Sequence, residues 1–188
     1  MFDKSYRWLN PPRHDIKDGK LIVFTSPETD FWQRTHYGFQ KDNGHCYIKK
    51  VNYNFSVTVR TESYPDKQYD QCGLIVRKDG DNWIKASMEY ENTNHYRLGS
   101  VVTNNGFSDW ATLDIKNKTV VMWYRIQNNE NDFLIEYSSD GKDWNQLRIT
   151  HLFNSFSYLQ VGIYACSPMD SSFTAIFDNY KLEKSNWK

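Results

Sequence analysis

The strict alternation of side chains between residues 69 and 91 does most to limit the folds that this chain can adopt. Two apolar runs flank a tight turn at Asp79-Gly80-Asp81, which is a common signal for a β-hairpin. Because successive side chains of a strand point to opposite faces, each strand separates into two sets. One set is apolar and suits a protein core: Cys72, Leu74, Val76, Ile84, Ala86, Met88 and Tyr90.

The other face of this hairpin has an unusual composition. It brings an aromatic ring, a lysine, an amide and two carboxylates together around Gly73, which has no side chain. The register with the shortest sensible loop pairs Arg77 with Trp83, Ile75 with Lys85, Gly73 with Ser87 and Gln71 with Glu89. We interpret this face as the floor of a site. The alternative is an ordinary solvated face, which antiparallel sheets often have.

The remainder of the chain consists of short alternating runs separated by turn residues, with no long segment of helical period. Strands are expected at about 21–25, 44–49, 54–62, 95–103, 120–127, 133–138, 146–149, 159–166 and 172–182, with a loop at 107–110. This pattern predicts an all-β fold, a jelly-roll sandwich of two antiparallel sheets. We expect a single β-sandwich domain over residues 1–188, with an irregular N-terminal segment at about 1–13. The hairpin would lie at the centre of a concave sheet.

The balance of charge argues against several classes of partner. The chain has 23 basic and 23 acidic residues and a pI near 7.0, so neither nucleic acid nor a membrane surface is an expected partner. No apolar run is long enough for a transmembrane helix, and the N-terminus lacks the apolar segment of a signal peptide. Cys46, Cys72 and Cys166 fit no zinc motif and are expected to be small buried residues. These features predict a cytoplasmic protein, in which the sequons at Asn54 and Asn117 are chance occurrences.

Several blocks of the sequence form a recognisable series. They are TDFWQRTHYGF (29–39), DNGHCY (42–47), YDQCGLIVR (69–77), NWIKASMEY (82–90), SVVTNNGFSDW (100–110), YSSDGKDW (137–144) and GIYACSP (162–168). From about Trp8 to Leu182 the chain resembles the regulation-of-enolase family, a group of largely uncharacterised cytosolic domains. The resemblance implies a concanavalin A-like lectin/glucanase jelly roll. It implies no established reaction, because the family's name reflects a regulatory association.

The resemblance also marks individual positions. The family's blocks carry over as Tyr69, Asp70, Gln71, Arg77, Trp83, Lys85 and Glu89 in the hairpin region, and as Arg34, His36, Tyr37, Asp109 and Trp110 in the loops. Cys72 is a small departure, since Ala is expected there. Both residues are small, so the packing should be retained.

The polar face of the hairpin suits a carbohydrate or another small polar ligand. A sugar needs a flat ring to stack on and a partner for each hydroxyl group. Aromatic residues make up 16% of the chain; most are expected in the core, but Trp83 ends the polar face and Trp110 lies in a loop that can fold over it. The expected ligand-binding residues are Arg34, His36, Tyr69, Gln71, Arg77, Trp83, Lys85, Glu89, Asp109 and Trp110.

Glu89 and Glu91 allow a hydrolytic alternative. They lie two residues apart on one strand face, with Cα atoms about 6.5–7 Å apart, and a retaining glycosidase needs carboxyl groups about 5–5.5 Å apart. Hydrolases of the concanavalin A-like superfold carry a third acidic residue along the same strand, where this chain has Lys85 and Ser87. Lys85 is expected to hold a carboxylate ionised and so to oppose a general acid. If the protein is an enzyme, the candidates are Glu89, Glu91 and His36.

The histidines form no metal-binding pattern. The five His residues are scattered without HxH or HExxH spacing, and there is no EF-hand or phosphate-binding loop, so neither a metal nor a cofactor is expected.

The leading hypothesis is a non-catalytic, lectin-like binding module, extended to a regulatory role in carbohydrate metabolism. The alternatives are a glycoside hydrolase or lyase, and a protein-interaction regulator of a metabolic enzyme that binds its partner through the same face or a sheet edge.

Overall fold

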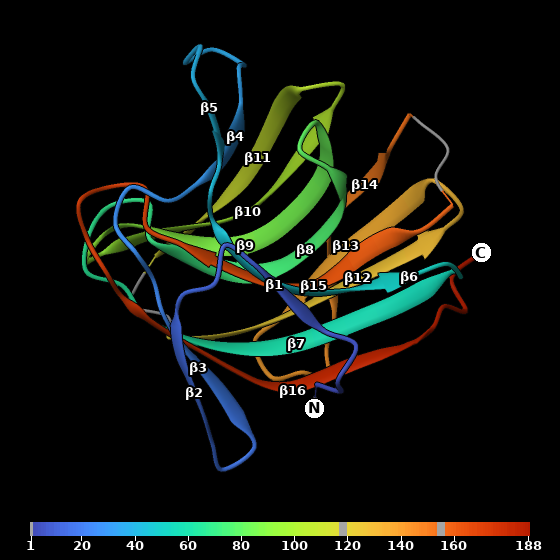
Figure 1. Ribbon diagram of the computed structural model, residues 1–188, viewed down its shortest axis with the longest axis horizontal. Coiled ribbons are helices and arrows are strands. Elements are labelled where there is room, and N and C mark those ends of the chain that lie inside the picture. The colour runs from blue at the N-terminus through green and yellow to red at the C-terminus, as the bar shows by residue number, and fades with distance from the viewer. Residues whose placement is uncertain (1, 117–119, 154–156) are drawn as a thin grey trace.

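The strands form a sandwich of two antiparallel sheets (Figure 1). The computed structural model describes residues 2–116, 120–153 and 157–188, and within these ranges it contains strands and no helix. Sheet A consists, in spatial order, of β1 (Arg7–Leu9), β6 (His45–Val51), β15 (Leu159–Cys166), β8 (Gln71–Asp79), β9 (Asn82–Asn92), β10 (His95–Asn104) and β11 (Phe107–Lys116). Sheet B consists of β14 (Asn145–His151), β13 (Asp132–Ser138), β12 (Val121–Asn129), β7 (Phe55–Tyr64), β16 (Thr174–Lys184), β3 (Lys20–Phe24) and β2 (Arg13–Lys17). A short hairpin of β4 (Phe31–Gln33) and β5 (Gln40–Asp42) stands over sheet A. The predicted jelly-roll sandwich is confirmed.

The main core lies between the sheets and follows the alternation in the sequence. The side chains of Leu74, Val76 and Ile84 are fully buried in it. They belong to the same cluster as side chains from sheet B, including Val57, Val59, Tyr124, Ile126, Phe133, Ile135, Ala175 and Phe177. Full burial of one such aliphatic or aromatic side chain contributes about 1.5–3 kcal/mol relative to its exposed state. The even-numbered face of the β8–β9 hairpin is therefore one of the parts of sheet A that pack against sheet B.

The register of β8 and β9 is the one predicted from the sequence. Gln71 lies opposite Glu89, Gly73 opposite Ser87, Ile75 opposite Lys85 and Arg77 opposite Trp83. β9 continues into β10 and β10 into β11, so that Lys85, Val101 and Trp110 form one row across the sheet. The polar set of the hairpin thus lies on the face of sheet A that is turned away from sheet B.

A second, smaller apolar cluster joins the β4–β5 hairpin to this outer face of sheet A. It consists of Phe31, Trp32, Cys46, Ile48, Ile75, Trp83, Val101, Tyr164 and Cys166. Phe31 is fully buried, and its ring lies so close to Gly44 that a Cβ atom there would be 2.3 Å from it. A residue with a side chain at position 44 would displace the ring, because cores have no room for such overlap. The outer face of sheet A is therefore partly roofed rather than open.

Several segments differ from what the sequence suggested. β2, β4 and β5 were not among the expected strands. The N-terminal segment at about 1–13 is not wholly irregular, because Arg7–Leu9 forms β1 and pairs with β6. Phe107 to Trp110 is the beginning of β11 and not a loop. Asn105 and Gly106 both have positive φ, which suits a two-residue turn that returns the chain directly into an antiparallel partner. The sequon at 117–119 lies outside the described residues.

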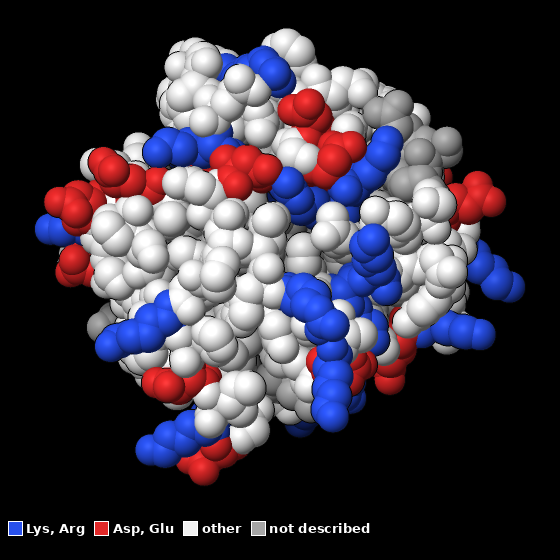
Figure 2. Space-filling view, in the orientation of Figure 1, with Lys and Arg blue, Asp and Glu red and all other residues white. Residues whose placement is uncertain are grey.

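Charged side chains of both signs are interspersed over the face of the molecule in Figure 2. The balanced formal charge of the chain is therefore distributed on this face rather than divided into an acidic and a basic half. Within the part of the chain that the structure describes, no helix has both the length and the apolar character needed to cross a membrane.

The substitution Phe31→Ala is expected to destabilise the protein by about 3–5 kcal/mol, because it removes a fully buried ring and leaves a cavity under the β4–β5 hairpin. Phe107→Ala is the matched control, since Phe107 is 61% exposed, and should change stability by less than about 0.5 kcal/mol. Urea titration followed by circular dichroism measures both free energies of unfolding. Equal losses of unfolding free energy in the two variants would contradict a stabilising role for the second apolar cluster.

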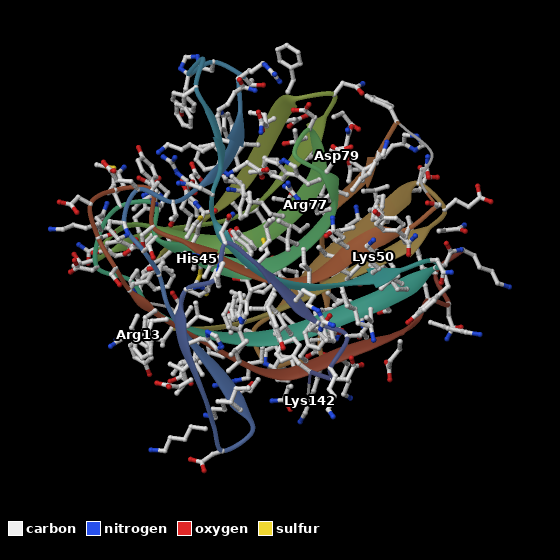
Figure 3. The ribbon with its side chains drawn as sticks, viewed as in Figure 1. Arg13, His45, Lys50, Arg77, Asp79 and Lys142 are labelled. Atoms are coloured by element: carbon white, nitrogen blue, oxygen red, sulfur yellow. The ribbon has the colours of Figure 1, made fainter. Side chains whose placement is uncertain are left out.

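His45 predicts a pH dependence of stability. Its ring is buried at the start of β6 (Figure 3), and its Nε2 accepts a hydrogen bond from the backbone N–H of Ser26 at 2.9 Å. The Nδ1 atom therefore carries the proton and donates to the carbonyl oxygen of Asn10 at 2.7 Å. Burial lowers the pKa of His45 below its usual 6.5, so the neutral ring is the folded form.

Because the unfolded chain binds this proton more readily, the contribution of His45 to stability is complete above about pH 6.5 and is lost as the pH falls through its lowered pKa. We expect the free energy of unfolding to decline less steeply between about pH 7 and pH 5 in His45→Gln than in the unmodified protein. The exposed His36 provides the control: His36→Gln should keep the original slope. Urea titrations over this pH range measure the three free energies of unfolding. If these free energies declined in parallel in the unmodified protein, His45→Gln and His36→Gln, His45 would not be the source of the pH dependence.

Candidate functional site

A pocket of about 290 Å³ lies on the outer face of sheet A, beneath the β4–β5 hairpin. Figure 1 shows this face as concave, with the hairpin above it. The lining of the pocket is aromatic and apolar at several points and polar at others. The hairpin and its approach contribute Asp30, Trp32, Tyr37 and Phe39; sheet A contributes Gln71, Lys85, Glu89, Val101 and Trp110; the connections before β8 and after β15 contribute Tyr69, Pro168 and Met169.

Gln71 is held in one orientation by three hydrogen bonds. Its Nε2 donates to Glu89 Oε2 at 2.8 Å and to the carbonyl oxygen of Tyr69 at 3.0 Å. Its Oε1 accepts from the hydroxyl of Tyr164 at 2.9 Å. Since Gln71 and Glu89 are paired across β8 and β9, the sheet register itself brings the amide and the carboxyl together. These groups form a fixed polar floor.

Lys85 is a buried cation that joins the sheet to the hairpin. Only 3% of the residue is exposed, and its ammonium donates to the carbonyl oxygen of Phe31 at 2.9 Å. It also lies 3.4 Å from Asp30 Oδ1. The ammonium is 5.6 Å from the ring centre of Tyr164, within the range of a cation–π contact. A buried charge is costly unless it is paired and hydrogen-bonded, and Lys85 satisfies both conditions.

Glu89 has two carboxyl oxygens in different surroundings. Oε2 accepts from Gln71, whereas Oε1 is buried and has no hydrogen-bonding partner among the described residues. Burial raises the pKa of Glu89 to about 8, with Lys85 and Arg97 opposing the rise and Asp30 adding to it. The expected effect of Lys85, which was to hold a carboxylate ionised, is present but is outweighed by burial. Glu89 is therefore mostly protonated at neutral pH.

Glu91 does not join Glu89 in the pocket. Its carboxylate lies 2.9 Å from Arg97 Nη1 and accepts from Gln68 Nε2 at 2.8 Å. The lining of the pocket does not include it. The two carboxyl groups that the sequence offered as a catalytic pair thus have different surroundings and different partners. This arrangement weakens the hydrolytic alternative in the form that the sequence suggested.

Two of the predicted ligand-binding residues on the hairpin are structural. Trp83 is fully buried in the second apolar cluster, and its Nε1 donates to the carbonyl oxygen of Gly80 at 3.0 Å, so it offers no surface to a ligand. Arg77 lies near the end of β8 (Figure 3) and makes two hydrogen bonds to Asp42, at 2.6 and 2.7 Å. Alternation placed both side chains on the correct face, but the β4–β5 hairpin covers that end of the sheet.

Three further predicted residues also lie outside the pocket lining. Arg34 donates to the carbonyl oxygen of Gly106 at 2.8 Å and so joins the turn of the β4–β5 hairpin to the β10–β11 turn. His36 is exposed, with its ring 4.8 Å from that of Tyr37. Asp109 is exposed and forms an ion pair with Arg148 at 3.0 Å. Of the ten predicted residues, the pocket contains Tyr69, Gln71, Lys85, Glu89 and Trp110.

The remaining lining residues were not predicted as ligand-binding positions. They are Asp30, Trp32, Tyr37, Phe39, Val101, Pro168 and Met169. The density of aromatic and charged residues between 29 and 39 was a visible signal, and Tyr37 belonged to a family block. Nothing local distinguishes Pro168 and Met169, because their position depends on how the chain after β15 returns across the sheet.

The described ranges contain no group of three or more His, Cys, Asp or Glu side chains arranged to hold a metal ion. The acidic groups of the pocket instead have protein partners. Asp30 faces Lys85 and accepts the backbone N–H of Phe31 at 2.7 Å, and Glu89 accepts from Gln71. The chemistry of the pocket is therefore that of hydrogen bonds, aromatic surfaces and a buried acid.

The two antiparallel sheets and the pocket on the concave face define a β-sandwich domain with a roofed recess. The chain belongs to the family described as "Protein of unknown function (DUF1349)", whose model matches residues 8–185. It is 35% identical over 176 residues to "Regulation of enolase protein 1" of Saccharomyces cerevisiae, covering 93% of this chain and 87% of that protein. The resemblance to the regulation-of-enolase family is thereby confirmed.

Solved structures agree on the fold. A functionally unknown protein from Saccharomyces cerevisiae superposes with a TM-score of 0.90 at 32% identity, over 97% of this chain and 98% of the other. The carbohydrate-binding module CBM66 from Bacillus subtilis gives 0.62 at 12% identity, over 96% of each chain. The GH43 protein BlXynB from Bacillus licheniformis gives 0.74 at 16% identity, with 98% of this chain matching 38% of that one. The last two likenesses concern the fold alone.

The ion pair between Arg77 and Asp42 should contribute to stability, because it fixes β5 to the buried end of β8. Asp42→Asn is expected to cost about 1–3 kcal/mol, since the Arg77 side chain is only 8% exposed and would lose its charged partner. Asp81→Asn is the control: Asp81 lies 3.6 Å from Arg34 and is 56% exposed, so the loss should stay below about 1 kcal/mol. Chemical denaturation of both variants measures the difference. A loss for Asp81→Asn as large as that for Asp42→Asn would rule the assignment out.

Proposed function

We propose that the protein is a lectin-like module that binds a carbohydrate, or another small polar ligand of similar size, in the pocket beneath the β4–β5 hairpin. One observation carries the proposal: aromatic side chains surround a group of fixed polar side chains in a single recess of about 290 Å³. This volume lies near the lower end of the usual range of ligand pockets, about 300–1,000 Å³, which favours a ligand of one or two sugar rings.

The polar groups suit the recognition of hydroxyl groups. Glu89 is fixed by its hydrogen bond from Gln71, so it can present its second oxygen to a ligand without first losing side-chain freedom. Trp110 and Tyr69 offer flat surfaces beside them. A sugar has both apolar ring faces and hydroxyl edges, and it matches this combination of aromatic and polar lining.

The charges around the pocket favour an uncharged ligand. Lys85 is balanced by Asp30, and Arg97 by Glu91. Glu89 is mostly neutral below its raised pKa of about 8. A strongly charged ligand would have to compete with these internal pairs, whereas a neutral polyol leaves them intact. The carbohydrate-binding module among the structural neighbours supports the same choice of ligand class through its fold.

A regulatory role is an extension of this proposal. The yeast relative is named for regulation of enolase, which is a statement about that protein. When a sugar fills the pocket, the module would offer a different surface to a protein partner. Sugar binding and regulation would then be two aspects of one function, and the module would respond to the supply of carbohydrate. A hydrolytic function is less well supported, because Glu91 lies outside the pocket lining and is already paired with Arg97.

A glycan array followed by titration calorimetry on the hits tests the proposal. Trp110→Ala should weaken binding of an array hit by about tenfold or more, since it removes a ring from the pocket. Trp144→Ala is the matched control, because Trp144 packs 4.2 Å from the Arg125 guanidinium, outside the pocket lining, and should leave affinity unchanged. Absence of any binding glycan, or equal affinity of the two variants, would refute carbohydrate binding in this pocket.

A further inference from the structure

A second, much smaller cavity adjoins the main pocket and is lined in part by Glu89. Its volume is about 10 Å³, and it shares Gln71, Glu89, Val101 and Trp110 with the main pocket. The rest of its lining comes from the centre of sheet A and includes Ser87, Arg97 and Gly99. The volume is close to the smallest that can hold one water molecule.

Glu89 lines this cavity, and its Oε1 is buried without a hydrogen-bond partner among the described residues. A buried polar atom without a partner costs about 1–3 kcal/mol, so such atoms are normally satisfied by the protein or by an ordered molecule. Gln71 cannot serve, because its Nε2 already donates to Oε2 and to the carbonyl oxygen of Tyr69. The geometry therefore calls for one small hydrogen-bonding group next to Oε1.

We infer that this cavity is a hydroxyl subsite of the main pocket, in which Glu89, as a neutral acid, donates a hydrogen bond from Oε1 to a water molecule or to one hydroxyl group of a bound sugar. The inference rests on the proposed function for the identity of the ligand. It also assigns Glu89 the role of a hydrogen-bond donor to the ligand and not that of a carboxylate acceptor.

A hydroxyl group fits the other groups of the cavity. Its oxygen can accept two hydrogen bonds and its proton can be donated once. Glu89, Arg97 and the indole N–H of Trp110 are donors in the lining, and the Ser87 oxygen is an acceptor. Arg97 retains donors for this purpose, although one of its nitrogens lies 2.9 Å from Glu91. An ammonium group would instead face the positive Arg97, and an apolar group would leave Oε1 unsatisfied.

Gly99 shapes the wall of the subsite. A Cβ atom at this position would lie 2.7 Å from the backbone oxygen of Ala111, 2.9 Å from the Thr112 methyl group and 3.3 Å from Trp110 Nε1. The absence of a side chain therefore allows the indole of Trp110 to lie against β10, where it borders both cavities. The aromatic surface and the hydroxyl subsite are adjacent, as a sugar ring and its substituent require.

The protonation state follows from all the groups that act on Glu89. Burial is the dominant cause and raises its pKa to about 8. Asp30 and Glu91 act in the same direction, and Lys85 and Arg97 oppose them. Tyr69, Tyr164 and Cys166 also interact with the carboxyl group, and each has a pKa raised by its own burial, so they stay neutral while Glu89 titrates.

Two measurements on the free protein test the inference without any sugar. A high-resolution crystal structure at about pH 6.5 should contain an ordered water within hydrogen-bonding distance of Oε1. Carbon-13 NMR of labelled glutamate carboxyls should contain one signal that titrates near pH 8 and that is absent in Glu89→Gln. A Glu89 signal that titrates in the ordinary range of glutamate, about 4–5, would overturn the inference whatever sugars do.

The second test uses a panel of methyl glycosides of common hexoses and pentoses, with binding followed by tryptophan fluorescence. Affinity for a binding glycoside should fall about tenfold between about pH 7 and pH 9, because only the protonated fraction of Glu89 binds. Glu89→Gln keeps a neutral donor at all pH values and should bind with less than about twofold change over this range. Glu62→Gln on sheet B is the matched control and should retain the tenfold fall.

The outcomes separate the two proposals. If a glycoside binds with no pH dependence, or if Glu89→Gln abolishes its binding at pH 7, the subsite role of Glu89 is wrong although the pocket binds sugar. If the water and the titration are found and no glycoside binds, the proposed carbohydrate function is wrong, and with it the assignment of the subsite to a sugar hydroxyl.

Discussion

The buried ammonium group of Lys85 is the contact on which the architecture of the pocket depends. It rises from the middle of sheet A and donates to the carbonyl oxygen of Phe31, at the start of the β4–β5 hairpin. A cation in this position must be satisfied, and Phe31 and Asp30 satisfy it only if the hairpin lies over the sheet. The same placement seals Phe31 and Trp83 into an apolar cluster and leaves the pocket beside it. Lys85 thus holds the β4–β5 hairpin over the sheet together with the Arg77–Asp42 ion pair and the apolar cluster, and the hairpin defines the recess.

The roof also explains the unusual acid. Glu89 lies four residues from Lys85 on the same strand and, on an open sheet face, would be hydrated and ionised. Under the hairpin and beside Trp110 it loses water, and this loss raises its pKa more than the nearby positive charges lower it. The hydrogen bond from Gln71 satisfies only one of its two oxygens. Oε1 of Glu89 is therefore left without a hydrogen-bond partner among the described residues.

The local alternation of the sequence predicted how β8 and β9 pair, but it did not predict the β4–β5 hairpin that covers them. The alternation of residues 69–91 predicted the pairing of Gln71 with Glu89, because a shift by one residue would have exposed the apolar set. It placed Trp83 and Arg77 on the correct face but contained no information on what lies above them. That depends on the hairpin and on Asp42, which is distant in sequence. The strand at 107–116 was missed because an edge strand with mixed polarity lacks a clear alternation.

The pocket draws its lining from residues 30–39, 69–89, 101–110 and 168–169, which are brought together by long-range strand pairing. No smaller part of the chain contains a version of it, so a recess of this kind appears only when the last strands of sheet A have docked. Pairing between distant segments is the slow part of folding in all-β proteins. Any molecule that occupies the recess binds the finished structure and not its precursors, and it stabilises the whole sandwich by mass action. A filled pocket therefore also indicates that the sandwich has folded completely.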